Sequence, residues 1–104
     1  NPQGIRTMTD AEIARMGEYA RQALDTPALS EALKRLHELA LEQFKRTDIR
    51  DAEGLKLARQ FAAVTDDFET ILKRMVEGGR LAQINLDKHR DESLAKRAFR
   101  RVTR

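Results

Sequence analysis

The sequence contains no cysteine and no tryptophan, and only two of its 104 residues are proline and five are glycine. Without cysteine, the chain has no disulfide framework, no thiolate nucleophile and no cysteine-based metal site. Four Phe and one Tyr are the only aromatic residues, a profile that suits helices better than strands. No apolar run approaches the roughly 20 residues that span a bilayer, and no leader-like segment opens the chain. We expect one small all-α domain, soluble and intracellular or packaged from inside a cell.

Charged side chains make up 36% of the residues, and their distribution is uneven. The formal net charge is +3, but residues 80–104 hold eight Lys or Arg against three acidic residues, which gives +5 for this segment. Residues 1–79 therefore sum to −2. A mildly acidic body with a basic C-terminal arm indicates an acidic partner or nucleic acid.

The first helix is predicted over residues 10–24, after an extended N-terminal arm of residues 1–8. Thr9 and Glu12 have the spacing of a capping box, in which each side chain accepts from the other residue's amide. Gly17 inside this helix costs about 1 kcal/mol relative to Ala, unless a neighbouring backbone uses the space.

A second helix is predicted over residues 27–46, with Thr26 as its N-cap and Pro27 in its first turn. Its apolar residues alternate steps of three and four and form a broad face. That face consists of Leu29, Leu33, Leu36, Leu39, Ala40 and Phe44.

A third helix is predicted over residues 51–77, with Asp48 or Asp51 as its N-cap and a left-handed end at Gly78 and Gly79. Its apolar residues have the 3, 4, 3, 4 spacing of a heptad seam. We expect the two long helices to form an αα-hairpin, whose apolar faces the short first helix cannot cover. The seam for self-association or a partner is predicted at Phe61, Phe68, Leu72 and Met75.

The basic C-terminal arm, residues 80–104, allows two local structures. Residues 81–87 alternate apolar and polar side chains and could form a short strand, but the chain offers no second strand to pair with it. We therefore favour a helix throughout the arm.

The chemistry-bearing residues form no recognisable catalytic or metal-binding motif. His37 and His89 lack the spacing of zinc ligands, so solvated histidines are expected. Asp66, Asp67 and Glu69 point to different sides of one helix and predict a charged outer face. We expect no enzyme activity, no cofactor, no metal and no small-molecule substrate.

On a helical arm, the apolar residues share one side while the basic residues spread over the rest. Such a helix could neutralise phosphates, dock on an acidic protein through Phe99, adsorb weakly to a membrane, or have no dedicated partner. We favour a protein partner, then nucleic acid bound without sequence preference. The predicted contact residues are Lys96, Arg97, Phe99, Arg100, Arg101 and Arg104.

Residues 26–82 resemble the small helical-hairpin proteins encoded among the structural genes of tailed bacteriophages. The "TPA" opener, an acidic residue before the second long helix and the "GRLA" closer carry this resemblance. It implies a virion or virion-assembly component without assigned catalytic residues, located in the virion or the host cytoplasm. The arm would then dock on a portal, tail or internal protein, or on packaged DNA.

Two hypotheses follow. In the first, the chain is a non-enzymatic structural or assembly protein that forms a homo-oligomer through its helical hairpin and docks through its arms. In the second, it is a small nucleic-acid-binding accessory protein whose arm holds phosphate backbones.

Overall fold

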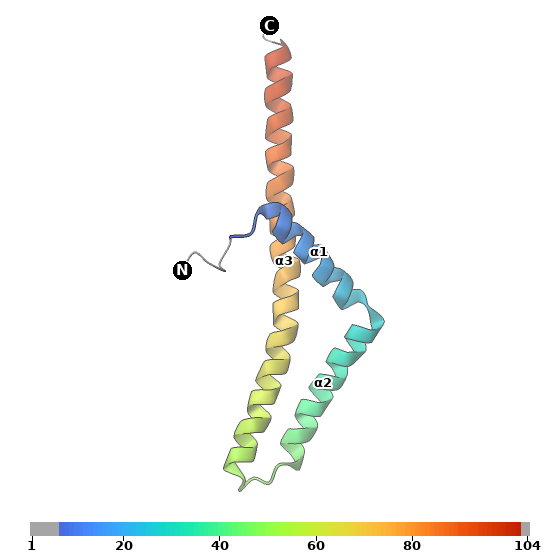
Figure 1. Ribbon diagram of the computed structural model, residues 1–104, viewed down its shortest axis with the longest axis vertical. Helices are drawn as coiled ribbons and strands as arrows, with labels where there is room; N and C mark the ends of the chain where they lie inside the picture. The colour runs from blue at the N-terminus through green and yellow to red at the C-terminus, as the bar shows by residue number, and fades with distance from the viewer. Residues whose placement is uncertain (1–6, 103–104) are drawn as a thin grey trace. The chain divides into compact units, whose positions relative to one another are not determined.

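The computed structural model describes residues 7–102 of the chain. These residues form three α-helices and contain no strand: α1 is Asp10–Asp25, α2 is Pro27–Arg46 and α3 is Ala52–Val102 (Figure 1). The predicted all-α class is confirmed. Only the last two residues of the predicted extended arm 1–8 are described, and Arg104 lies outside the described residues.

The capping box at the start of α1 is confirmed. The Thr9 amide donates to Oε1 of Glu12 at 3.0 Å, and the Glu12 amide donates to Oγ1 of Thr9 at 3.1 Å. Two amides of the first turn, which have no partner within the helix, are thereby satisfied.

A single residue, Thr26, separates α1 from α2, and Pro27 begins α2 as predicted. Thr26 occupies the N-cap position of α2 as predicted, but its side chain does not cap the helix. Its hydroxyl donates to the carbonyl of Gln22 at 2.9 Å and makes no hydrogen bond to the first turn of α2. The hydroxyl bonds to the last turn of α1 because that turn leaves carbonyls without helical partners.

Two aspartates accept hydrogen bonds from backbone amides in the connection between α2 and α3. Oδ1 of Asp48 accepts from the Arg50 amide at 2.8 Å, and Oδ1 of Asp51 accepts from the Gly54 amide at 2.9 Å. Asp51 is therefore the residue whose side chain caps α3, one of the two candidates from the sequence.

The predicted end of the third helix at Gly78 and Gly79 is wrong, because α3 continues through both glycines to Val102. Neither glycine adopts the left-handed conformation of a helix C-cap. The segment 81–87 is helical, so the strand alternative is excluded, and the described part of the basic arm is the second half of α3.

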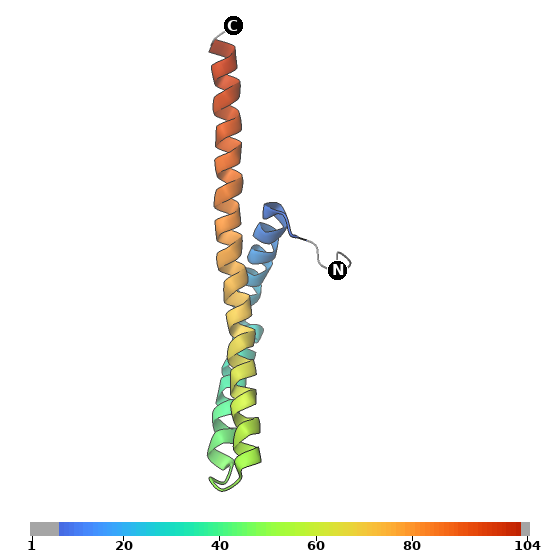
Figure 2. The same cartoon turned by 90° about the vertical axis from the view of Figure 1, so that its left-hand side faces the viewer.

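Residues 20–74 form one compact unit, in which α2 lies beside the first part of α3 in both Figure 1 and Figure 2. The buried side chains of this contact are Leu33 and Ala40 from α2 and Ala58 and Thr65 from α3. Three of the four are small, which allows the two backbones to approach closely. The Thr65 hydroxyl donates to the carbonyl of Phe61 at 2.9 Å, so its burial leaves no polar atom unsatisfied.

The second compact unit combines residues 1–19 with residues 75–104. In its described part, the backbones of α1 and α3 touch at Gly17 and Gly79. A Cβ added to Gly17 would lie 2.6 Å from Cα of Gly79 and 2.7 Å from the carbonyl oxygen of Met75. Gly17 therefore occupies a site where a neighbouring backbone uses the space, the one case in which its lower helix propensity has a structural reason.

Candidate functional site

A stripe of large apolar side chains on α3 faces solvent within the unit of residues 20–74. Its most exposed members are Leu57 and Val64, at 64% and 67%, followed by Ile71 at 53% and Phe68 at 48%. We call these four residues the free stripe. Exposure of this much aliphatic and aromatic surface on one helix is typical of a site that binds another protein.

The free stripe lies beside the residues of α3 that pack against α2. Ala58 and Thr65, each one position after a free-stripe residue, are buried. Successive helical residues are turned by about 100°, so α3 has two apolar sides, of which α2 covers one. The seam predicted from the sequence is divided between them: Phe61 and Leu72 are half-buried, whereas Phe68 and Met75 are exposed.

On α2, Leu39 is exposed at 49% and Leu36 is half-buried. Within the described residues no side chain is fully buried. The apolar side chains of this unit are therefore incompletely removed from water, which limits the stability that the hydrophobic effect provides.

His37 of α2 contacts two carboxylates of α3, and Lys73 of α3 contacts one of them. Nε2 of His37 lies 2.8 Å from Oε1 of Glu69, and Nδ1 of His37 lies 3.6 Å from Oδ1 of Asp66. Nζ of Lys73 lies 2.6 Å from Oε2 of Glu69. Hydrogen bonds from Lys73 and then from His37 lower the pKa of Glu69 below its usual value of 4.5.

Replacing Glu69 by Gln is expected to lower the free energy of unfolding at pH 7 by less than about 1 kcal/mol, since Glu69 and its partners are partly exposed. The pKa of Glu69 is depressed in the folded state. Its contribution is therefore complete above pH 4.5 and is lost as the pH falls through the folded-state pKa. Urea unfolding at pH 7 and pH 3 should show the difference from wild type shrinking at the lower pH. The exposed Glu38→Gln on α2 is the control, and an equal loss in both variants would contradict the prediction.

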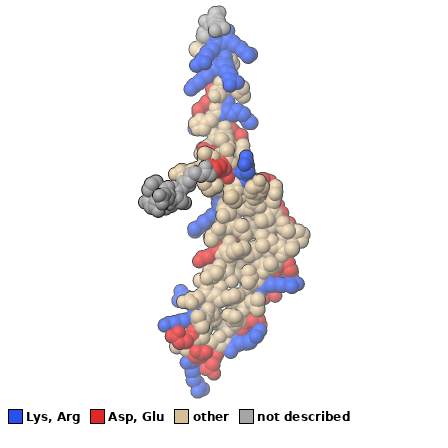
Figure 3. Space-filling model, in the orientation of Figure 1, with Lys and Arg blue, Asp and Glu red and all other residues tan. Residues whose placement is uncertain are grey.

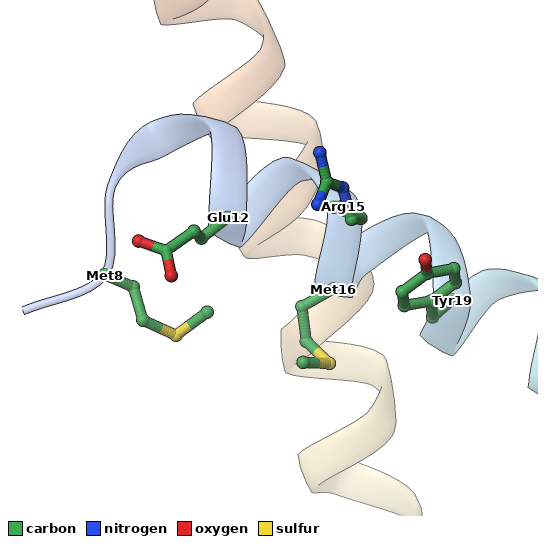
Figure 4. Close-up of a pocket in the computed structure, with 5 residues that line it drawn as sticks. All are labelled: Met8, Glu12, Arg15, Met16 and Tyr19. Atoms are coloured by element: carbon green, nitrogen blue, oxygen red, sulfur yellow. The ribbon is translucent and has the colours of Figure 1, made fainter.

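A shallow hollow of about 180 Å³ lies on α1 and is lined by Met8, Glu12, Arg15, Met16 and Tyr19 (Figure 4). All five residues come from one helix and the segment just before it, and the hollow opens to solvent. Its volume is below the roughly 300–1,000 Å³ of typical ligand pockets. A second open hollow, of about 260 Å³, lies beside His37 and Glu69.

Among the residues that the structure describes, no three His, Cys, Asp or Glu side chains are arranged to hold a metal ion.

The predicted contact residues of the basic arm lie on the last turns of α3. Lys96, Arg97, Phe99, Arg100 and Arg101 are all exposed there. Lys and Arg side chains gather around this end of the helix in Figure 3. Phe99 is 69% exposed, so a large apolar side chain accompanies the positive charge here.

The sequence interpretation missed Leu57 and Val64 as part of the exposed surface. They occur seven residues apart and are followed by Ile71 after another seven, which is a second heptad signal. That signal overlaps the predicted seam, and spacing alone does not say which of two neighbouring stripes α2 covers.

No helix within residues 7–102 combines the length and the apolar character needed to cross a membrane. No known protein family, no curated protein and no solved structure matches the chain.

Proposed function

We propose that this protein is a non-enzymatic structural or assembly protein that forms oligomers through residues 20–74 and docks through its ends. The observation that carries the proposal is the free stripe on α3, which leaves four large apolar side chains about half or more exposed. Covering these side chains with another protein surface would remove apolar area from water, which is the main favourable contribution to most protein–protein association.

The arrangement of α2 beside α3 supports an αα-hairpin as the oligomerising element. A two-helix hairpin has few fully buried side chains of its own and gains a core when further helices pack on it. With the resemblance to phage structural gene products, we place the protein in a phage particle or its assembly, where the basic end of α3 contacts a portal, tail or internal protein.

Light scattering coupled to size exclusion should give the full chain a single mass that is at least twice the 11.9 kDa of one chain. A version that stops at Ser93 lacks the exposed basic end but keeps residues 20–74, so we expect it to retain oligomerisation. The proposal predicts that added duplex DNA leaves the elution of both versions unchanged at two salt concentrations. A full chain that remains a monomer at every concentration tested would contradict it.

The second candidate function is non-specific nucleic-acid binding, which the exposed Lys96, Arg97 and Arg101 favour. If about four phosphates are contacted, a fourfold rise in salt should weaken binding by roughly a hundredfold. This function replaces the first if the full chain shifts with duplex DNA at low salt and the version ending at Ser93 does not.

A further inference from the structure

We propose that two copies of this chain pair through the free stripe of α3, antiparallel and about a two-fold axis, with Asp67 of each copy opposite Arg74 of the other. The inference deepens the proposed function, on which it rests, by naming the occupant of the free stripe as a second copy. Three observations carry it: the angle between the two apolar sides of each helix, the heptad spacing of α3, and the charges beside that heptad.

The geometry of the two helices fits one half of a four-helix bundle. Each helix of such a bundle contacts two neighbours, so it needs two apolar sides roughly at right angles. On α3, Val64 and Thr65 lie about 100° apart, and only the side of Thr65 is covered by α2. On α2, Leu39 lies about 120° from the buried Leu33. Both helices therefore have one covered and one uncovered apolar side.

The two uncovered sides open on the same face of residues 20–74. Counted at 100° per residue, His37 lies about 40° from Leu33, and Glu69 lies about 40° from Thr65 in the same rotational sense. Because the helices run in opposite directions, equal senses fall on the same face, and His37 does contact Glu69 at 2.8 Å. Leu39 is turned in the other rotational sense from Leu33, and Val64 is turned in that same sense from Thr65. Both side chains therefore belong to the face opposite His37 and Glu69.

The uncovered side of α3 has the pattern of a coiled-coil partner. Phe61, which is half-buried at the border with the covered side, is followed at steps of three, four and three by the exposed Val64, Phe68 and Ile71, the alternation of core positions in a coiled coil. Asp67 lies six residues after Phe61, and Arg74 lies six residues after Phe68. Both therefore occupy the flanking heptad position on the side of the core that is away from α2.

Charge selects the direction and register of the pair. When Phe68 of one copy faces Ile71 of the other, in antiparallel direction, the flanking positions bring Asp67 opposite Arg74 twice, once on each side of the axis. A shift by one heptad would bring Asp67 opposite Asp67, or Arg74 opposite Arg74. Parallel helices would bring Asp67 near Leu72, which offers no charge. Among the described residues neither Asp67 nor Arg74 forms an ion pair within its own chain, so both are available.

The test uses reversal of these two charges in the full chain, followed by sedimentation equilibrium. Asp67→Arg or Arg74→Asp alone creates two like-charge contacts, and we expect the dissociation constant of the pair to rise roughly tenfold or more. The double variant Asp67→Arg with Arg74→Asp restores two opposite-charge contacts and should associate like wild type. An equimolar mixture of the two single variants should form mixed pairs, since each supplies the charge that the other now needs.

Arg59→Asp is the matched control, because it makes the same change of charge as Arg74→Asp on a side of α3 away from the free stripe and should leave association unchanged. Circular dichroism separates loss of pairing from loss of folding. A single variant with the helicity of the wild type is folded, so its weaker association is due to the reversed charge. Single variants that associate like wild type while the oligomer persists would overturn this pairing and leave the proposed function standing. A wild-type chain that never associates would overturn both.

Discussion

Gly79→Ala is expected to destabilise the protein by about 1–3 kcal/mol, although alanine is the better helix former by about 1 kcal/mol. A Cβ on Gly79 would lie 2.7 Å from Cα of Gly17 and 3.2 Å from the carbonyl oxygen of Ile13. Both atoms belong to the backbone of α1, so neither can rotate away as a flexible side chain would. The two helices must separate, and urea unfolding followed by circular dichroism measures the loss.

Gly78→Ala is the matched control, since it changes the neighbouring residue of the same helix. A Cβ on Gly78 would meet only Cγ2 of Ile13 at 3.9 Å, an ordinary van der Waals contact. We expect Gly78→Ala to stabilise the protein by up to about 1 kcal/mol. Stabilisation by both substitutions would show that the backbones of Gly17 and Gly79 do not touch in solution.

Leu33→Ala is expected to lower the free energy of unfolding by about 2–3 kcal/mol, toward the lower end for a buried leucine. Leu33 is 6% exposed in the contact between α2 and α3, where the other buried side chains are small. Removal of its side chain loses contacts that Ala40, Ala58 and Thr65 cannot replace. The space it leaves joins the open hollow that Leu33 lines beside His37, so no closed cavity forms and the loss stays at the lower end. The measurement is urea unfolding at a fixed protein concentration.

Leu41→Ala on the same helix is the control for Leu33→Ala. Leu41 is 56% exposed, so most of its side chain is already in water and its truncation should cost less than about 1 kcal/mol. Equal losses for the two leucines would contradict the assignment of Leu33 to the buried side of α2. A larger loss for Leu41 would place that residue in a contact that the isolated chain does not make.

Local signals in the sequence predicted the beginnings of the helices well. The capping box of Thr9 and Glu12 forms as expected, and Pro27 begins α2. These signals are reliable because the partners lie within three or four residues and satisfy amides that the helix itself cannot. Thr26 is the exception, since its hydroxyl could bond to either of two adjoining helices and bonds to α1.

The end of the third helix depended on contacts that the sequence does not reveal. Two consecutive glycines usually favour a helix end, yet α3 continues through Gly78 and Gly79. The reason is tertiary: Gly79 allows α1 to pack backbone to backbone at Gly17, so the glycine is used for close approach and not for a left-handed turn.

The sequence by itself determined the helical class, the helix beginnings, the basic end of the chain and the heptad spacing of the third helix, because each depends on composition or on residues within a few turns of one another. Only the tertiary structure decided which apolar stripe of α3 is covered. Two stripes with the same 3, 4 spacing adjoin on that helix, and the packing of α2 on Ala58 and Thr65 leaves Val64, Phe68 and Ile71 exposed. Periodicity indicates that a helix has an apolar side, whereas the position of the neighbouring helix determines which part of that side stays exposed and can bind a partner.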